Sequence, residues 1–464
     1  MAQSTDRRDH ALCSVHAPRR TLIKEPPLSL LYRFVWGAVR LVAPLLSIGD
    51  SKLARGVAGR RRAHELLVLW GETMRDPQRP VAWFHAPSVG EGLQAQAVIA
   101  ELRVARPDLQ VVFTFFSPSA EDLARSMDVD VAAYLPWDLK RPLTQVLDAL
   151  RPTAVVFTKT EIWPTLASEA TRRHIPVAIV AATVPEGAGR TRPLARLLLG
   201  RAWRRLALAA ANSEPDADML EELGVPADVV EVVGDPGIDS AASRFDARNR
   251  DAAWLAPFRR DARPTLVAGS TWPSDEDVLV PALEEVRTVA EDLRVVIAPH
   301  EPSDAVVSQL MKRLRSAGWR TTTLADFEGE PERSASSGKN GPDAIVVERV
   351  GVLAELYEAA TVSFVGGGFH DRGLHSVLEP AAAGTPVVFG PGHHNARAAS
   401  DLLEAGGAKV AGDPQALAGV LNTWLSDEEG RTEAGAAAVG YIDRHRGAAR
   451  RCATLLDSLI SMTR

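Results

Sequence analysis

Two glutamates stand where a short β-rich run gives way to a helical pattern, a place where a carboxylate can do chemistry. Glu91 lies in the segment HAPSVGEG, residues 85–92, beside Ser88 and Gly90. A carboxylate at such a turn can act as a general base. It can equally be a helix-start glutamate that the helix dipole favours. The segment by itself leaves both interpretations open.

The second glutamate, Glu379, belongs to a stretch with the layout of a ligand-binding unit. The β-branched run 361–365 stops at the glycines 366–368, and a second apolar run, 386–389, ends in another glycine turn. Without a Cβ, such turns let backbone N–H groups approach an anion. Two strands that end in glycine loops on either side of a helix are typical of a nucleotide cleft at the carboxyl edge of a parallel sheet. A plain structural turn is the alternative.

Length and composition indicate an ordinary globular protein with more than one domain. The 464 residues exceed one typical core, and 46% hydrophobic with 24% charged residues exclude a mainly disordered chain. A net charge of −6 gives no support to nucleic-acid binding. Cys13 and Cys452 lie far apart without Cys or His neighbours at metal spacing, so neither a disulfide framework nor a zinc site is expected.

The basic charge is concentrated at the N-terminal end, where residues 1–62 hold twelve Lys and Arg against four Asp and Glu. This segment contains an apolar stretch, residues 28–46, that Arg33 and Arg40 interrupt on one helical face. We expect a helix lying in a membrane interface, with Arg60, Arg61 and Arg62 on anionic lipid. A buried core helix with two snorkelling arginines is the alternative.

From residue 81 onward, short β-rich runs alternate with helical stretches, which predicts parallel, doubly wound sheets. One series of runs begins near residues 81, 111, 154, 177, 206 and 229, and a second near 265, 294, 345, 362 and 387. We therefore predict an α/β protein of two Rossmann-like domains, residues 63–240 and 241–440. A final helix over 441–464, within an amphipathic pattern that starts near residue 430, is expected to pack back across them.

Other turns after the predicted strands carry functional side chains. Ser117 lies in TFFSPSA, Lys159 and Glu161 lie in KTEIWP, and His300 with Glu301 lies in APHEPSD. Lys159 and Glu161 can also form a structural ion pair that caps a helix. The sequence holds no HExxH and no G-x-S-x-G pattern, so a metallohydrolase or serine hydrolase is not indicated.

Taken in order, these segments resemble the Kdo transferases, which attach 3-deoxy-D-manno-oct-2-ulosonic acid (Kdo) from CMP-Kdo to the lipid A precursor of lipopolysaccharide. The resemblance extends from Tyr32 to about Gly407. It rests on SVGE at 88–91, TFFSPS at 114–119, YLPWD at 134–138, KTEIW at 159–163, GSTWPSDE at 269–276, APHEP at 298–302, LAELY at 353–357, and VGGGF with HSVLEP at 365–380.

The resemblance implies a GT-B glycosyltransferase with the acceptor on the N-terminal domain and CMP-Kdo on the C-terminal domain. It implies a metal-independent, inverting transfer at the cytoplasmic face of the inner membrane, with Glu91 as catalytic base. The donor-binding residues implied are Ser270, Thr271, His300, Glu355, Gly366, Gly367, Gly368, His375, Glu379 and Asn395. The acceptor-side or structural residues implied are Ser88, Gly90, Ser117, Lys159 and Glu161.

Two departures from the family pattern affect the donor side. Many members have Arg-His where this chain has His300-Glu301, and His-Asn where it has His375-Ser376. We expect Glu301 to point away from the phosphate, because a carboxylate there would be unfavourable. A catalytically silent GT-B relative that binds a nucleotide sugar or lipid is the alternative function. Retention of both Glu91 and Glu379 favours the enzyme.

Overall fold

The computed structural model describes residues 36–37, 52–184, 192–260, 263–329 and 342–463. The predicted interfacial helix over 28–46 therefore lies outside the described residues, apart from Trp36 and Gly37. Within the described part, no helix is long and apolar enough to cross a membrane.

The first half of the chain forms a parallel sheet in the strand order β3-β2-β1-β4-β5-β6-β7. Strands β1, β2, β4 and β5 are buried along their whole length, as expected for a parallel sheet with helices on both faces. The strands are β1 (Val81–Ala86), β2 (Gln110–Phe115), β3 (Val131–Tyr134), β4 (Ala154–Thr158), β5 (Val177–Ala182), β6 (Leu206–Ala211) and β7 (Val230–Val232). The helices are α2 (Lys52–Thr73), α3 (Val89–Ala105), α4 (Glu121–Ser126), α5 (Lys140–Leu150), α6 (Pro164–Arg172), α7 (Pro193–Trp203) and α8 (Glu214–Glu222).

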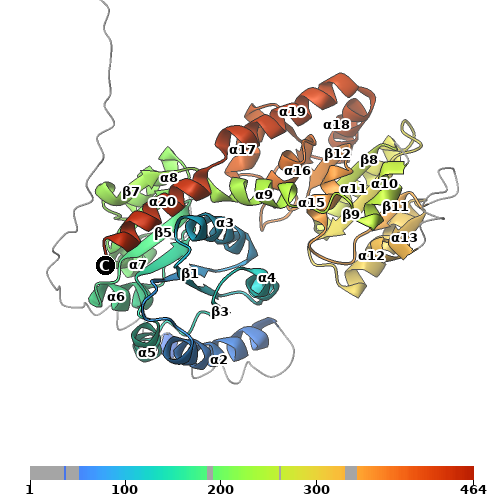
Figure 1. Ribbon diagram of the computed structural model, residues 1–464. Coiled ribbons are helices and arrows are strands. Elements are labelled where there is room, and N and C mark those ends of the chain that lie inside the picture. Colours follow the sequence, from blue (N-terminus) through green and yellow to red (C-terminus); the bar gives the residue numbers. More distant parts are fainter. Residues whose placement is uncertain (1–35, 38–51, 185–191, 261–262, 330–341, 464) are drawn as a thin grey trace, which may run out of the picture.

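The second half forms another parallel sheet, in the order β10-β11-β9-β8-β12-β13-β14. Figure 1 shows the two sheets in separate lobes. The strands are β8 (Thr265–Thr271), β9 (Arg294–Pro299), β10 (Thr321–Thr323), β11 (Ala344–Val346), β12 (Val362–Val365), β13 (Val387–Phe389) and β14 (Ala408–Val410). The helices are α9 (Pro236–Asp246), α10 (Ala256–Arg260), α11 (Pro273–Val286), α12 (Asp304–Ser316), α13 (Leu324–Gly329), α15 (Leu353–Glu358), α16 (Leu378–Ala382), α17 (Arg397–Glu404), α18 (Pro414–Ser426), α19 (Glu428–His445) and α20 (Ala448–Ser461).

The predicted strands all form, and the sequence pattern missed three more. These are β3, β10 and β14, which stand at sheet edges and are three or four residues long. TTT and AKV lack the continuous apolar run that marks a strand buried on both faces, and VAAY is apolar but only four residues long.

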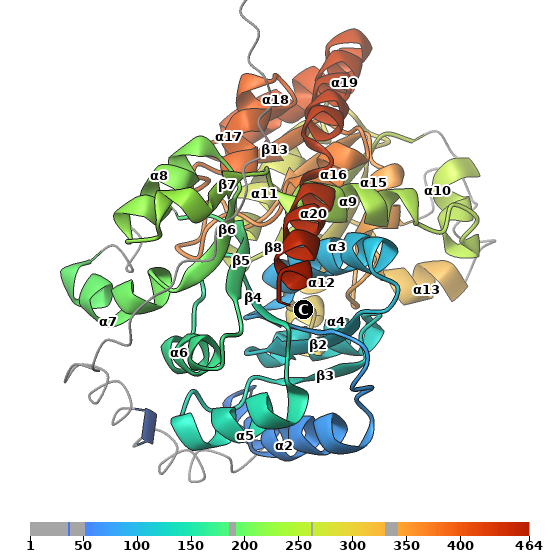
Figure 2. The ribbon, with the colours of Figure 1, turned by 60° about the vertical axis from the view of Figure 1, so that its left-hand side comes forward.

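A single amphipathic helix from residue 430 to the C-terminus is not what forms. The pattern is divided between α19 and α20, and the break falls at Gly447, whose φ of 95° lies in the left-handed region. Glycine adopts this conformation at little cost, so the chain turns there. The part that packs back is α20, which contacts α3, α9 and β6 (Figure 2).

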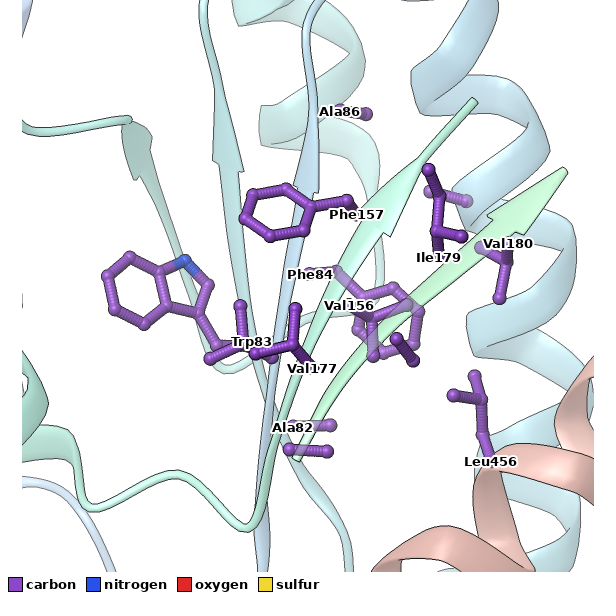
Figure 3. Packing of buried hydrophobic residues seen from close by; sticks show 14 of the residues in the cluster. Ala82, Trp83, Phe84, Ala86, Val156, Phe157, Val177, Ile179, Val180 and Leu456 are labelled. Atoms are coloured by element: carbon purple, nitrogen blue, oxygen red, sulfur yellow. The ribbon is translucent and has the colours of Figure 1, made fainter. Parts of the chain in front are cut away.

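The core of the first lobe contains side chains from both ends of the chain. Trp83, Phe84 and Phe157 from the sheet are fully buried, and Leu456 of α20 belongs to the same cluster (Figure 3). Cys452 is also buried in this cluster. The C-terminal helix therefore contributes directly to the hydrophobic core of the N-terminal lobe.

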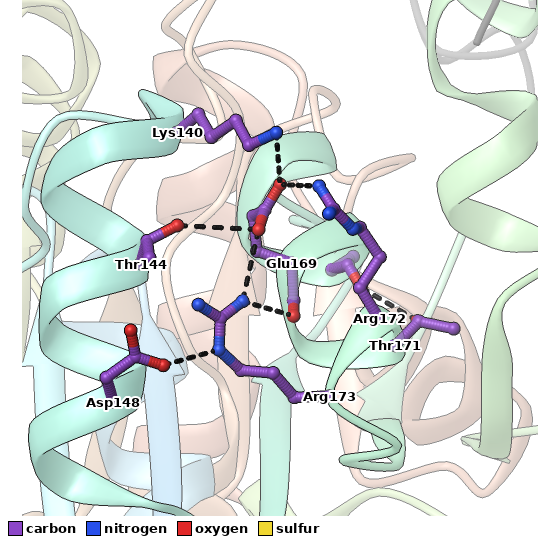
Figure 4. Close-up of polar contacts among 8 residues, drawn as sticks. Lys140, Thr144, Asp148, Glu169, Thr171, Arg172 and Arg173 are labelled. Carbon is purple, nitrogen blue, oxygen red and sulfur yellow. Dashed lines mark hydrogen bonds and ion pairs between the residues drawn. The ribbon is translucent and has the colours of Figure 1, made fainter. Parts of the chain in front are cut away.

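A polar cluster joins α5 to α6 (Figure 4). The buried carboxylate of Glu169 pairs with Arg172 at 3.2 Å and Arg173 at 3.1 Å, and Lys140 approaches it to 4.0 Å. Arg173 also donates to Asp148 at 2.8 Å. Because buried carboxylates need such partners, the cluster fixes the packing of these two helices behind the loop that precedes α6.

Both sheets reverse their strand order at one internal position. In the first sheet this switch point lies between β1 and β4, and in the second between β8 and β12. Ligands of open α/β sheets bind outside the carboxyl ends of the strands at such points. The segments after these four strands are therefore the place to look for a site. The predicted domain bounds at 240 and 440 fall inside α9 and α19, and those bounds stay a prediction.

Candidate active site

At the first switch point, Glu91 in the first turn of α3 meets Lys159, which follows β4. The Lys159 Nζ lies 3.1 Å from the Glu91 Oε1, and the Ser88 hydroxyl donates to Oε2. The carboxylate is largely buried, with 15% of its side chain exposed, whereas Lys159 is 41% exposed. The structure thus brings Lys159 to a carboxylate 68 positions earlier along the chain.

The charge state of Glu91 follows from these contacts. Burial by itself raises the pKa of Glu91, but the charge of Lys159 and the hydrogen bonds from Ser88 and Lys159 more than offset it, so the pKa lies below its usual value. The carboxylate is therefore charged at neutral pH. Each of its oxygens still has lone pairs for a further donor, which leaves it able to accept a proton.

The other predicted residues of the first lobe have different surroundings. Ser117 donates its backbone N–H to the Pro87 carbonyl at 2.8 Å, which places it beside Ser88. Gly90 is exposed, and a Cβ there would meet no atom within 4 Å. Glu161 is half-buried, and its charge acts on Arg60.

Arg60 corrects one of the sequence-based expectations. Instead of meeting lipid, its guanidinium is buried: it donates to the Gly56 carbonyl at 2.9 Å and the Phe116 carbonyl at 2.8 Å, and it lies 3.8 Å from the centre of the Phe116 ring. Desolvation lowers the pKa of Arg60 to about 10. Arg61 and Arg62 are exposed. The expectation that all three arginines share one lipid-facing surface is wrong for Arg60, because neighbouring helix positions point to different faces.

His85 stands at the end of β1 in a network that sequence reasoning missed. The Trp163 Nε1–H donates to His85 Nε2 at 3.0 Å, and His85 Nδ1 lies 3.1 Å from the Thr114 hydroxyl. Because the indole nitrogen can only donate, Nε2 accepts and the ring proton resides on Nδ1. Complete burial lowers the pKa of His85 to about 3. The network anchors the segment that carries Lys159.

At the second switch point, Asp275 of α11 organises the glycine loop after β12. Its carboxylate accepts the backbone N–H groups of Trp272 and Gly367, each at 2.8 Å, and that of Phe369 at 3.2 Å. The Gly366 N–H donates to the Gly269 carbonyl at 2.9 Å. The donors of Gly366 and Gly367 therefore hold the loop itself, rather than facing an anion as the sequence led us to expect.

Glycines are needed here because two loops pack backbone against backbone. Gly367 has a φ of 93°, and a Cβ on Gly368 would collide with the backbone of Gly390. The Gly392 N–H donates to the Gly368 carbonyl at 2.8 Å. The two glycine turns of the sequence are thus in direct contact.

A stack of rings covers the end of β8. The Trp272 ring lies 4.8 Å from both His300 and His370, and the Arg372 guanidinium lies 5.1 Å from its centre. The Trp272 Nε1–H donates to His375 Nε2 at 2.9 Å. Burial, together with the two neighbouring imidazoles, lowers the pKa of His375 to about 4. Four potential donors to an anion therefore gather where the phosphate ligands were expected, and Trp272, His370 and Arg372 had not been predicted.

The strand end beneath this stack is irregular. Ser270 has a φ of 57°, in the left-handed region that is costly for a residue with a side chain, and the register of β8 with β9 shifts there. The Thr271 hydroxyl donates to Glu276 at 3.3 Å, and the Thr271 carbonyl accepts the His300 N–H at 2.9 Å. Glu301 is exposed to solvent.

The remaining predicted donor residues have varied surroundings. Glu379 pairs with Arg244 of α9 at 2.8 Å, a partner that the sequence did not indicate. Asn395 accepts the Leu374 N–H at 3.0 Å and donates to its carbonyl at 3.2 Å, so its amide fixes the loop backbone. One carboxylate oxygen of Glu355 is buried without a hydrogen-bond partner among the described residues.

Helix α9 connects the two sites. Asp235, at its start, accepts from Gln94 of α3 at 2.8 Å, and Arg244, near its end, holds Glu379. A second link is the Arg397 guanidinium, which donates to the Ser213 hydroxyl at 2.8 Å. Within the described ranges, no group of three or more His, Cys, Asp or Glu residues could hold a metal ion.

The chain is similar in sequence to several known proteins. Residues 61–240 match the family described as 3-deoxy-D-manno-octulosonic-acid transferase (kdotransferase). The transferase of that name from Haemophilus influenzae is 24% identical over 433 residues, which cover 92% of this chain and 98% of the relative. The one from Bordetella pertussis is 26% identical over 434 residues, covering 90% and 97%. The one from Chlamydophila psittaci is 28% identical over 335 residues, covering 70% and 72%.

Solved structures show the same fold at low sequence identity. The UDP-GlcNAc 2-epimerase from Neisseria meningitidis superposes with a TM-score of 0.55 at 14% identity, over 83% of this chain and all of the other. The one from Methanocaldococcus jannaschii gives 0.51 at 15% identity, over 78% and 99%. These likenesses concern the two-lobed architecture.

Proposed function

We propose that this chain is a glycosyltransferase of the Kdo transferase kind, which transfers Kdo from CMP-Kdo to a lipid A precursor in lipopolysaccharide biosynthesis. Its sequence similarity to proteins of that name supports the proposal. The main observation behind the proposal is that each of the two sheets has functional side chains at its switch point. One presents a charged, largely buried carboxylate, and the other presents imidazoles, an arginine and a glutamate beside a glycine loop.

In the proposed reaction, Glu91 removes the proton from an acceptor hydroxyl as its oxygen attacks the anomeric carbon of Kdo. The new C–O bond forms while the bond to the CMP phosphate breaks, and CMP leaves with the electron pair. Attack opposite to the leaving group inverts the anomeric centre in a single step. Such a transfer needs one carboxylate as general base and no second carboxylate as nucleophile. The low pKa of Glu91 supports this role, because the base is ready in its charged form.

The donor is proposed to occupy the second switch point. The imidazoles of His300, His370 and His375 supply hydrogen-bond donors for the leaving phosphate, and Arg372 supplies positive charge. Glu379, held by Arg244, is suited to accept hydrogen bonds from ribose hydroxyls. Transfer is proposed to need no metal ion, which predicts undiminished activity in an excess of EDTA.

Purified protein incubated with CMP-Kdo and a tetraacyl lipid A precursor tests the function. We expect the mass of the lipid to rise by that of Kdo. Glu91→Gln should cut turnover by a factor of about 100 or more, the loss expected for a missing general base. Titration with CMP should give nearly the wild-type affinity, because the donor site lies in the other lobe.

Glu101→Gln is the matched control, because Glu101 lies on the same helix away from Lys159, and it should keep full turnover. Normal turnover in Glu91→Gln would exclude Glu91 as the base. CMP binding by wild-type protein without any transfer to the lipid would instead favour the catalytically silent alternative.

We further propose that the N-terminal segment attaches the protein to the cytoplasmic face of the inner membrane. Its basic, apolar sequence supports this. The structure shows where a truncation belongs: Ala54 and Arg60 of α2 are buried, so the cut must precede residue 52. Protein lacking residues 1–51 should still bind CMP but lose salt-sensitive binding to anionic vesicles. Unchanged vesicle binding would contradict the assignment.

A further inference from the structure

Lys159 has an unusual backbone conformation, and its side chain is directed to Glu91 and not to its own loop. Its φ of 64° lies in the left-handed region, which costs a residue with a side chain about 1 kcal/mol where glycine pays nothing. Its N–H donates to the Val180 carbonyl at 2.8 Å, which ties the strained residue to the end of the sheet. This backbone geometry accompanies the approach of Nζ to Glu91.

The loop after Lys159 is fixed by contacts that do not involve the lysine side chain. Asp138 accepts the N–H groups of Thr165 and Leu166 at 3.0 and 2.9 Å, and Trp163 is held by His85. The lysine side chain is therefore not needed to hold the loop, and its ammonium group is directed to the carboxylate.

We propose that Lys159 is the positioning residue of the Glu91 base, holding its Oε1 in place and keeping it ready to accept a proton. This inference rests on the proposed function and deepens it. Lys159 contacts the Oε1 atom of the carboxylate and the Ser88 hydroxyl donates to Oε2, so the two contacts together fix the orientation of the carboxylate plane. The exposed part of the ammonium group faces solvent, where an anionic substrate can approach.

The surrounding charges determine the direction of the expected effect. Around the pair lie Asp235 at the start of α9, whose buried carboxyl feels the charge of Lys159, and Asp216 of α8, which acts on Asp235. Lys159 is the cation that lowers the pKa of Glu91, whereas burial raises it. Without Lys159, the hydrogen bonds from Ser88 and the backbone remain to oppose burial, but the largest opposing contribution is gone, so Glu91 holds its proton to a higher pH.

The proposal is tested by comparing the pH profile of kcat/KM of the Lys159→Met variant with that of the wild type. The acid limb should move to higher pH, because a larger fraction of Glu91 is then protonated at each acidic pH. A shift of one pH unit lowers activity on the acid side about tenfold, while the loss at pH 8 is smaller. Lys159→Arg keeps the charge and should restore the wild-type limb.

The control is Lys140→Met. Lys140 is about as exposed as Lys159, at 43% against 41%, and it too approaches a buried glutamate. Its partner is Glu169 rather than Glu91 (Figure 4). This variant should leave the pH profile unchanged. A loss that is uniform across pH in Lys159→Met, or an equal shift in Lys140→Met, would overturn the proposal.

A second readout does not depend on transferase activity. The titration of the Glu91 carboxyl can be followed by carbon-13 NMR, with the signal assigned by its absence in Glu91→Gln. We expect a higher titration midpoint in Lys159→Met than in wild type, and an identical midpoint would overturn the proposal. If the wild type transfers no Kdo, the proposed function fails while this titration still decides the role of the ion pair.

Discussion

At the scale of single residues, the molecule uses buried polar side chains to hold its candidate site in place. His85 and Asp275 belong to different lobes, yet each stands at a switch point and fixes a loop by hydrogen bonds. Neither is expected to touch substrate. Their burial gives them unusual charge behaviour: the pKa of His85 is lowered and that of Asp275 is raised, in both cases because burial disfavours the charged form.

A prediction about His85 follows from this chemistry. The imidazole should remain neutral, with its proton on Nδ1, as the pH falls from 8 to 5, because its folded-state pKa is about 3 and its Nε2 is occupied by Trp163. Nitrogen-15 NMR of histidine-labelled protein distinguishes the tautomers. The signal can be assigned with His85→Gln, and a titration midpoint near the usual value of about 6.5 would contradict the buried network.

At the scale of elements, the segment from β4 to α6 shows how a site loop is made rigid. Asp138, nearly inaccessible to solvent, accepts two N–H groups from the first turn of α6. This explains the aspartate in YLPWD without any contact to substrate. The same helix is joined to α5 by the Glu169 cluster. The loop with Lys159 is thus held at its far end by α6.

Asp138→Ala should lower the free energy of unfolding by about 1–3 kcal/mol, because two buried N–H groups lose their acceptor. It should also reduce turnover, since the loop that carries Lys159 loosens. Urea unfolding and the lipid assay measure the two effects. Asp427→Ala removes an exposed cap on α19 that accepts the Gly430 N–H at 2.9 Å. This control should cost about 1 kcal/mol or less and leave turnover unchanged, and equal effects of both variants would refute the argument.

At the scale of the whole molecule, the chain crosses between the lobes twice, through α9 and through the turn before α20. Asp239 of α9 joins these crossings, because it accepts the N–H groups of Gly447 at 2.6 Å and Ala449 at 2.9 Å. Arg451 adds a hydrogen bond to the Val233 carbonyl at 2.7 Å. The first lobe is therefore completed by the last helix of the chain.

Leu456→Ala tests this dependence. Leu456 is fully buried against the first sheet, so its truncation should cost about 2–5 kcal/mol. Met462, on the other hand, is 57% exposed, and Met462→Ala should change stability by less than about 0.5 kcal/mol. Denaturant unfolding compares the two. A small effect of Leu456→Ala would mean that α20 is dispensable for the first lobe.

Much of the architecture followed from local pattern. Continuous apolar runs separated by helical stretches predicted the parallel sheets, because central strands buried on both faces have an unmistakable composition. The edge strands β3, β10 and β14 were not predicted, because segments of three or four residues at a sheet edge carry little signal. The positions of Glu91 and Lys159, each after a strand, were likewise legible in the sequence, because turns after parallel strands gather at one sheet edge.

Local sequence patterns were enough to establish the fold class and the segments that could do chemistry, but the packing of the folded chain fixed which side chains meet. Strand order places β4 beside β1, so Lys159 reaches Glu91 rather than pairing within its own loop. The same folding buries Arg60, supplies Arg244 to Glu379, and occupies the glycine-loop donors with Asp275. These partners come from distant segments, and their distances depend on how sheets and helices pack, which local periodicity does not encode.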